Sequence, residues 1–115
     1  MNNFSNELVP DSAVQAALEY LGAEPHPVAI TRANVTRAEN LRKKVFANAF
    51  LNAKGNNEER KATAEVSAVY EAAKSNEEKA IEEFRDHEQR VKRAELVIDL
   101  WRTVQSNNRA MERIR

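Results

Sequence analysis

The densest group of residues that could do chemistry is a basic run, Arg42-Lys43-Lys44, which Arg37 precedes and Lys54 follows. Lysine and arginine neutralise phosphate groups, which gives nucleic acids an affinity that is independent of base sequence and falls with salt. Phe46 and Phe50 lie just beyond the run, and an exposed ring there could stack on a base of a single strand. The bases are equally compatible with an ordinary solvated face, whereas the phenylalanines are better explained as core.

The two histidines are the remaining candidates for acid–base or metal chemistry. His87 follows Glu83 and Asp86, but a carboxylate metal site on helices needs a second Glu-x-x-His motif, which the chain lacks. His26 lies between two prolines, far in sequence from any partner. The chain contains no cysteine and no glycine-rich phosphate loop. We therefore expect a protein that is not an enzyme and that holds neither a metal nor a cofactor.

A third group lies near the C-terminus, where Trp101 is followed by arginines and side-chain amides. Tryptophan and arginine are enriched at the centres of protein interfaces. The same residues could instead close an apolar core, and the sequence does not separate these two roles. We expect the oligomer interface or core to include Phe84, Val91, Ile98, Trp101, Arg102 and Arg109.

Helices must position all three groups. Glycine and proline together number only five in 115 residues, whereas charged residues make up 31% of the chain, a composition typical of long, charged helices. The last helix is the clearest, because its inward positions alternate at intervals of four and three, as in a coiled-coil seam. The seam residues are Ala80, Phe84, His87, Val91, Ala94, Ile98 and Trp101. The predicted fold is all-α: an elongated helical hairpin or bundle with a long, coiled-coil-like C-terminal helix, which oligomerises.

The N-terminal segment precedes this hairpin, and the sequence leaves open whether it docks on the hairpin. After a loose tail over residues 1–10, a short helix should start with Asp11 or Ser12 as its N-cap and end at a left-handed Gly22. The prolines at 25 and 27 then prevent the helix from continuing, so residues 23–27 should form a hinge. We assign residues 1–27 to a tail, a short helix and a hinge, and residues 28–115 to a helical DNA-binding and oligomerisation domain.

The hairpin itself is predicted from its turn residues. The second helix should run from about Thr31 to Lys54, and a third should begin near Glu58 after a glycine–asparagine turn. Ser75 and Glu78 have the spacing of a capping box, so a new helix start at Ser75 is favoured over one continuous helix.

The composition predicts that one chain alone has a thin core. Hydrophobic residues make up 42% of the chain, but 18 of these 48 residues are alanine, which adds little area when it is buried. A second chain could supply the missing core.

No apolar run approaches the roughly 20 residues that span a bilayer, and residues 1–11 lack the basic residues of a secretory signal. We therefore expect a cytoplasmic protein without a membrane partner.

The charges are segregated along the chain although their sum is zero. Counting Lys and Arg against Asp and Glu gives −4 for residues 1–31, +5 for 32–54, −4 for 55–84 and +3 for 85–115. The basic blocks could bind a polyanion, or they could pair with the acidic blocks of a neighbouring subunit. The sequence leaves both interpretations open.

The order of these segments is similar to that of the UvsY-type recombination mediators of tailed phages. The resemblance covers about residues 30–113, from a basic helix that ends in a glycine turn, through an acidic segment, to the aromatic stretch Ile98-Asp99-Leu100-Trp101 and on to Asn108-Arg109-Ala110-Met111. Arg42-Lys43-Lys44 matches the basic start of the family's DNA-binding helix. Trp101 matches an aromatic in the last helix, where the family packs and oligomerises. The chain departs from the family between Phe46 and Ala53, which is uncharged, and residues 1–27 have no counterpart.

The resemblance implies a recombination mediator. Such a protein would form a ring-shaped homo-oligomer, bind single-stranded DNA and help to load a RecA-like recombinase on strands coated by single-strand binding protein. The DNA contacts expected here are Arg37, Arg42, Lys43, Lys44 and Lys54. The alternatives are a structural or scaffolding phage protein that binds protein partners only, and a small regulator that offers a helix face to a host factor.

Overall fold

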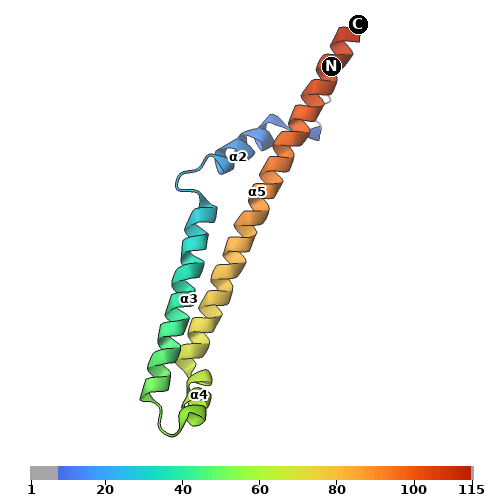
Figure 1. The fold of residues 1–115 in the computed structure, drawn as a ribbon. Coiled ribbons are helices and arrows are strands. Elements are labelled where there is room, and N and C mark those ends of the chain that lie inside the picture. The colour runs from blue at the N-terminus through green and yellow to red at the C-terminus, as the bar shows by residue number, and fades with distance from the viewer. Residues whose placement is uncertain (1–7, 115) are drawn as a thin grey trace. The chain divides into compact units, whose positions relative to one another are not determined.

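The computed structural model describes residues 8–114, and within them every element of secondary structure is an α-helix (Figure 1). The helices are α2 (Asp11–Leu21), α3 (Pro27–Asn52), α4 (Asn57–Glu65) and α5 (Ala68–Ile114). The predicted all-α class with a long C-terminal helix is therefore confirmed. The tail expected over residues 1–10 lies outside the described residues, apart from its last three. In this described range, no helix combines the length and apolar character that a membrane span requires.

The helices divide between two compact units. One unit runs from Val28 to Asp86 and contains α3, α4 and the first part of α5. The other contains α2 and the part of α5 that begins at His87. The chain passes from one unit to the other after Pro27, at the predicted hinge. The sequence leaves open whether the segment before the hinge docks on the rest of the chain; in the structure, α2 packs on the second part of α5 and shares its unit.

The unit of residues 28–86 is an antiparallel helical hairpin, with α3 beside the first part of α5 and α4 at the turn (Figure 1). Three contacts fix its register: Arg32 over the Phe84 ring, Arg42 with Glu77, and Phe46 with Tyr70. The residue numbers rise along α3 while those of the partners fall along α5, as antiparallel packing requires. At the turn, Gly55 adopts φ 107°, a left-handed conformation that glycine alone adopts without strain.

The ends of α2 and α3 differ in detail from the prediction. Pro10 caps α2 without a side-chain hydrogen bond, so the predicted cap by Asp11 or Ser12 is wrong. Gly22 does end α2, but with φ −91° rather than a left-handed conformation. Helix α3 begins at Pro27, four residues before the predicted Thr31, because the fixed φ of proline suits the first helical position, where no amide donor is needed.

The predicted helix start at Ser75 is wrong, because α5 passes through that position without a break. The break lies at Val66 and Ser67, where α4 has ended and α5 begins. Ser67 accepts a hydrogen bond from the amide of Tyr70 at 3.3 Å and donates one to the carbonyl oxygen of Ala64 at 2.8 Å. One hydroxyl thus caps the start of α5 and ties it to the end of α4.

In the other unit, α2 packs on α5 through small residues. Val14 and Ala17 of α2 and Ala94 of α5 are buried. The hydroxyl of Tyr20 lies 2.7 Å from Nδ1 of His87 and donates to the carbonyl oxygen of His87 at 3.2 Å. Small side chains allow the two helices to approach closely, and the tyrosine fixes one end of α2 on α5.

The core is as thin as the composition predicted. The buried hydrophobic residues of the described chain are Val9, Val14, Ala17, Ala64, Ala73, Ala94 and Val104. The predicted seam of α5 is confirmed, because each of its seven residues is buried or half-buried. Large apolar side chains remain exposed elsewhere, among them Leu41, Leu51, Val66 and Val69 in the hairpin.

Candidate nucleic-acid interface

The bases of α3 do not lie on one face of the helix. Helical spacing places Arg42 in the middle of the side that packs on α5, between the half-buried Ala38 and Phe46. Its Nε atom donates to Oε2 of Glu77 at 2.7 Å, and only 27% of the Arg42 side chain and 19% of the Glu77 side chain is exposed. The hydrogen bond to Glu77 raises the pKa of the Arg42 guanidinium further above its ordinary value. Arg42 therefore holds the hairpin together and is not part of the solvent-facing basic strip.

The phenylalanines next to the basic run also belong to the hairpin. The rings of Phe46 and Tyr70 meet edge to face with centroids 5.2 Å apart, and Phe46 and Phe50 are stacked at 6.5 Å. All three side chains are half-buried. Edge-to-face and offset-stacked contacts of this kind stabilise aromatic clusters beyond their buried area. Their half-buried rings and the contact of Phe46 across the hairpin favour the interpretation of both phenylalanines as core over a platform for bases.

The solvent-facing side of α3 carries the remaining bases. Arg37 and Lys44 are exposed and lie seven residues apart, which places them on the same side of the helix about 10.5 Å from each other along its axis. Arg37 donates to Oδ1 of Asn34 at 3.0 Å, and this contact orients the guanidinium without neutralising it. Lys54 is exposed just beyond the end of α3. Neither Lys44 nor Lys54 forms an ion pair with any residue between 8 and 114.

One acid, Glu39, lies on α3, and its charge is already matched. Nζ of Lys43 lies 3.0 Å from Oε1 of Glu39, one helical turn away. The hydrogen bond from Lys43 holds the pKa of the Glu39 carboxyl below its ordinary value. Both side chains are about half exposed, so solvent screens the pair and it contributes little to stability. The outward side of α3 therefore presents Arg37 and Lys44 among uncharged residues and without an acid.

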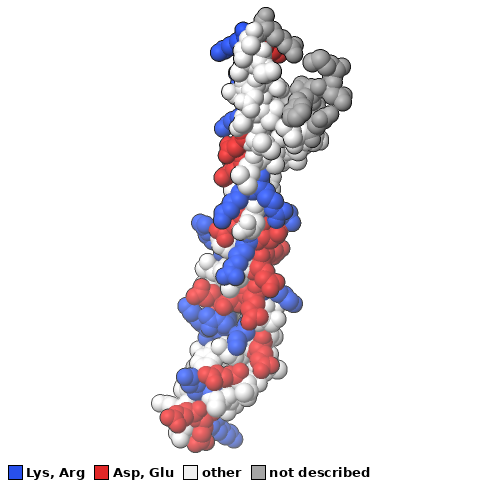
Figure 2. Space-filling view, turned by 90° about the vertical axis from the view of Figure 1, so that its right-hand side faces the viewer, with Lys and Arg blue, Asp and Glu red and all other residues white. Residues whose placement is uncertain are grey.

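The two long helices of the hairpin differ in charge. Helix α3 carries five bases and one acid, whereas α5 from Ala68 to Asp86 carries three bases and six acids. Figure 2 shows acidic and basic side chains mixed on one face of the molecule. A polyanion would be repelled by the first part of α5 and attracted to the outer side of α3. The basic and acidic blocks of the sequence thus become a basic helix, α3, that faces an acidic one, the first part of α5.

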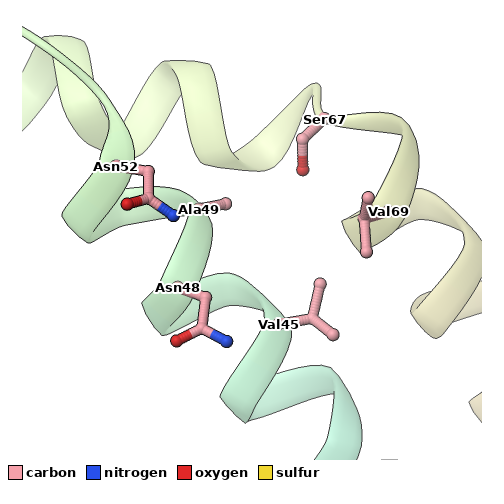
Figure 3. Close-up of a pocket in the computed structure, with 6 residues that line it drawn as sticks. All are labelled: Val45, Asn48, Ala49, Asn52, Ser67 and Val69. Carbon is pink, nitrogen blue, oxygen red and sulfur yellow. The ribbon is translucent and has the colours of Figure 1, made fainter.

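An open groove lies at the turn end of the hairpin (Figure 3). It has a volume of about 220 Å³ and is lined by Val45, Asn48, Ala49, Asn52, Ser67 and Val69. Asn48 and Asn52 extend along one side of α3, and Val45 and Val69 project toward one another from α3 and α5 (Figure 3). No acid, base or histidine lines the groove. Its surface suits an apolar side chain better than a charged ligand.

The residues predicted for the oligomer interface separate into two groups. Phe84, Val91, Ile98 and Trp101 are half-buried on the seam, and Phe84 also receives the guanidinium of Arg32 at 5.5 Å from its ring centroid. Arg102 and Arg109 are exposed. Nε of Arg109 donates to the carbonyl oxygen of Gln105 on its own helix at 3.4 Å. The seam residues serve the packing of the chain itself, and only the two arginines face solvent fully.

The histidines do not assemble a site with carboxylates. His87 pairs with Tyr20, and His26 meets the Tyr20 ring edge to face at 5.2 Å. Over residues 8–114, no group of three or more His, Asp or Glu side chains is placed to hold a metal ion.

Three structurally important residues were missed at the sequence level: Glu77, Tyr70 and Tyr20. Each acts through a contact between residues far apart in sequence, which periodicity within one helix does not reveal. If the start of α5 had been predicted at Ser67, antiparallel pairing of α3 with α5 would have placed Glu77 opposite Arg42.

In comparisons with known proteins, no family model, curated protein or solved structure matches this chain.

Proposed function

We propose that this protein binds single-stranded DNA along the outer side of α3 and acts, as an oligomer, as a recombination mediator. The observation that carries the DNA-binding proposal is the pair Arg37 and Lys44, exposed on one side of a helix whose acid is already matched by Lys43. Lys54 extends this surface past the helix end. Each phosphate contact is weak, but several copies of the strip on one strand raise the effective affinity steeply.

Loading of a RecA-like recombinase on strands coated by single-strand binding protein is the part of the proposal that rests on the resemblance to UvsY-type mediators. The chain's contribution would be to hold the strand on several basic strips at once, so that one coat protein can be exchanged for another. Binding through phosphates suits this role, because a mediator must act on strands of any sequence.

The test is fluorescence anisotropy of a labelled oligonucleotide over a series of salt concentrations. Binding to a single strand should weaken as salt rises, with a slope of about −0.7 per phosphate contact on logarithmic axes. The double variant Arg37→Ala/Lys44→Ala removes two contacts, so its slope should be shallower by about 1.4. The matched control is Lys61→Ala/Lys79→Ala, which removes two exposed bases of the same hairpin from α4 and α5.

The control should bind as the wild-type protein does. No binding at low salt, or equal losses in the two double variants, would refute the proposal. Arg42 is left unchanged, because its substitution would disturb the contact with Glu77 and confuse unfolding with loss of binding.

A second candidate function, a scaffold that binds protein partners only, is favoured by exposed apolar residues of the hairpin. Leu41, Val66 and Val69 are 49%, 73% and 64% exposed, and Val69 also lines the groove of Figure 3. Exposed apolar side chains that lie together mark protein interaction sites. A scaffold would ignore the oligonucleotide in the anisotropy experiment, and salt would weaken its self-association instead, which sedimentation at two ionic strengths would measure.

A further inference from the structure

The C-terminal part of α5 carries a second apolar stripe that the fold leaves uncovered. Leu96, Leu100, Met111 and Ile114 are 66%, 48%, 61% and 82% exposed. Together with Thr103 and Asn107 they recur at intervals of four, three, four, four and three residues, which keeps them on one side of a helix. Apolar residues repeated at this spacing are ordinarily buried against another helix.

This stripe is distinct from the seam. Ala94, Ile98, Trp101 and Val104 are buried or half-buried, and at 100° per residue their side of α5 lies roughly a third of a turn from the stripe. The surface of α5 that borders α2 is lined by Arg90, Arg93, Ala94 and Val97, again off the stripe. Within residues 8–114 nothing covers the stripe, which leaves it accessible to a partner from outside this range.

The order of residues along the stripe is the same in both directions. Counted outward from Gln105, the stripe has Thr103 and Asn107 two residues away, Leu100 and Met111 five and six residues away, and Leu96 and Ile114 nine residues away. The sequence is thus apolar at both ends and polar in the middle. A surface that matches itself when it is turned by half a revolution is what a two-fold contact between identical chains requires.

We propose that two copies of this chain pair through this stripe, with their α5 helices antiparallel and the two-fold axis near Gln105. Leu96 then packs against Ile114 of the second copy and Leu100 against its Met111, while Thr103 meets its Asn107. A polar pair at the centre of an apolar helix interface fixes the register of the two helices. This inference deepens the oligomer part of the proposed function and does not depend on DNA binding.

The charges beside the stripe select the antiparallel arrangement. Glu95 and Asp99 flank the first half of the stripe, and Arg113 flanks the second half on the same side of the helix. With the axis at residue 105, Arg113 of one copy lies opposite position 97 of the other, between Glu95 and Asp99. In a parallel pair, Arg113 would lie 14 residues, or about 21 Å along the helix axis, from Asp99 of the other copy, so this attraction between opposite charges would be lost.

Disulfide cross-linking tests this geometry directly, because the chain has no cysteine of its own. In the antiparallel pair, positions 100 and 111 of different copies are neighbours, whereas positions 100 and 100 are about 16 Å apart along the axis. A mixture of Leu100→Cys and Met111→Cys chains should give the mixed disulfide at least tenfold above either homodisulfide under mild oxidation.

The matched control is a mixture of Arg102→Cys and Arg109→Cys chains. These positions lie three and four residues from Gln105, and helical spacing turns them away from the stripe. They should cross-link at background yield. Sedimentation of the wild-type chain without DNA should show a dimer, and Leu100→Glu should reduce its association at least tenfold while circular dichroism keeps the helical signal.

Dominant Leu100→Cys homodisulfides would mean parallel pairing and would overturn the inference. A single-chain mass at all concentrations, or equal cross-linking in the control mixture, would overturn it too. Since none of these measurements contains DNA, their failure is distinguishable from a failure of single-strand binding.

Discussion

Nε of Arg42 and Oε2 of Glu77 lie 2.7 Å apart and join the middle of α3 to α5. Arg42 is the base of α3 that points most directly at α5, and Glu77 is one of the acids that α5 presents there. Their contact explains how a hairpin whose buried hydrophobic residues are the alanines at 64 and 73 still keeps a defined register. Charge-assisted hydrogen bonds are directional, whereas alanine contacts are not.

We predict that the Arg42–Glu77 pair is energetically coupled. In a double-mutant cycle of Arg42→Met and Glu77→Gln, each single variant should lower the urea midpoint, because it leaves the other partner half-buried and unmatched. The double variant should lower the urea midpoint by less than the two single variants do together. The same cycle on Lys43 and Glu39, an exposed pair, is the control and should show weak coupling. Strict additivity at Arg42 and Glu77 would contradict the prediction.

The Lys43–Glu39 pair gives a prediction about pH. Lys43 holds the pKa of Glu39 below its ordinary value of 4.5, so the folded state binds the proton of Glu39 less readily than the unfolded state does. The small stabilisation is therefore present above pH 4.5 and is lost as the pH falls through the lowered pKa. In an NMR titration, Lys43→Gln should raise the pKa of Glu39 toward 4.5. A pKa that stays unchanged would show that Lys43 does not act on this carboxyl in solution.

Much of the fold followed from the sequence because it depends on local periodicity. The α5 seam, the proline hinge and the glycine turn at Gly55 were predictable, since each follows from the residue types within a few positions. The break between α4 and α5 was misplaced because Ser75 and Glu78 have the spacing of a capping box. Within a continuous amphipathic helix, Ser75 and Glu78 are simply exposed to solvent. The true start at Ser67 has no glutamate three residues later, so it lacks the sequence signature of a capping box.

The candidate site was less predictable than the fold. The basic run was visible, but the sequence could not show that Arg42 turns inward while Lys44 turns outward, because the face that packs on α5 depends on the partner helix. For the same reason Arg37 becomes a stronger candidate for a DNA contact, because it lies nearer the middle of the outer side of α3 than Lys43 does. Tertiary contacts between distant residues decided the role of each base.

The aromatic cluster of the hairpin should contribute more to stability than its charges do. Phe46→Ala removes a half-buried ring that contacts both Phe50 and Tyr70, and we expect it to lower the free energy of unfolding by about 2 kcal/mol. Tyr70→Phe keeps the ring and removes only the hydroxyl, which interacts with the Arg42 guanidinium, so it should cost about 1 kcal/mol or less. Urea unfolding followed by circular dichroism measures both. Equal effects of the two variants would argue that the hydroxyl rather than the ring matters.

Ser67 and Ser75 offer a direct comparison of a helix cap with a residue in the helix interior. Ser67→Ala removes the hydroxyl that accepts from the Tyr70 amide, and it should destabilise the hairpin by about 1 kcal/mol. Ser75→Ala replaces an exposed residue within α5 by the best helix former, so it should be neutral or slightly stabilising. Thermal unfolding of the two variants distinguishes the observed break from the predicted one. A loss at Ser75 instead would place the helix start there.

The hydroxyl of Tyr20 should control how firmly α2 is held on α5. Both contacts are hydrogen bonds at once when Nδ1–H of His87 donates to the hydroxyl and the hydroxyl donates to the carbonyl oxygen of His87. Tyr20→Phe keeps the ring against His26 but removes both hydrogen bonds, so local opening of α2 should become easier by about 1 kcal/mol. Hydrogen exchange of the α2 amides should then be roughly five times faster. Tyr70→Phe, in the other unit, is the control and should leave this exchange unchanged; faster exchange there too would mean that α2 responds to global stability and not to its own contact.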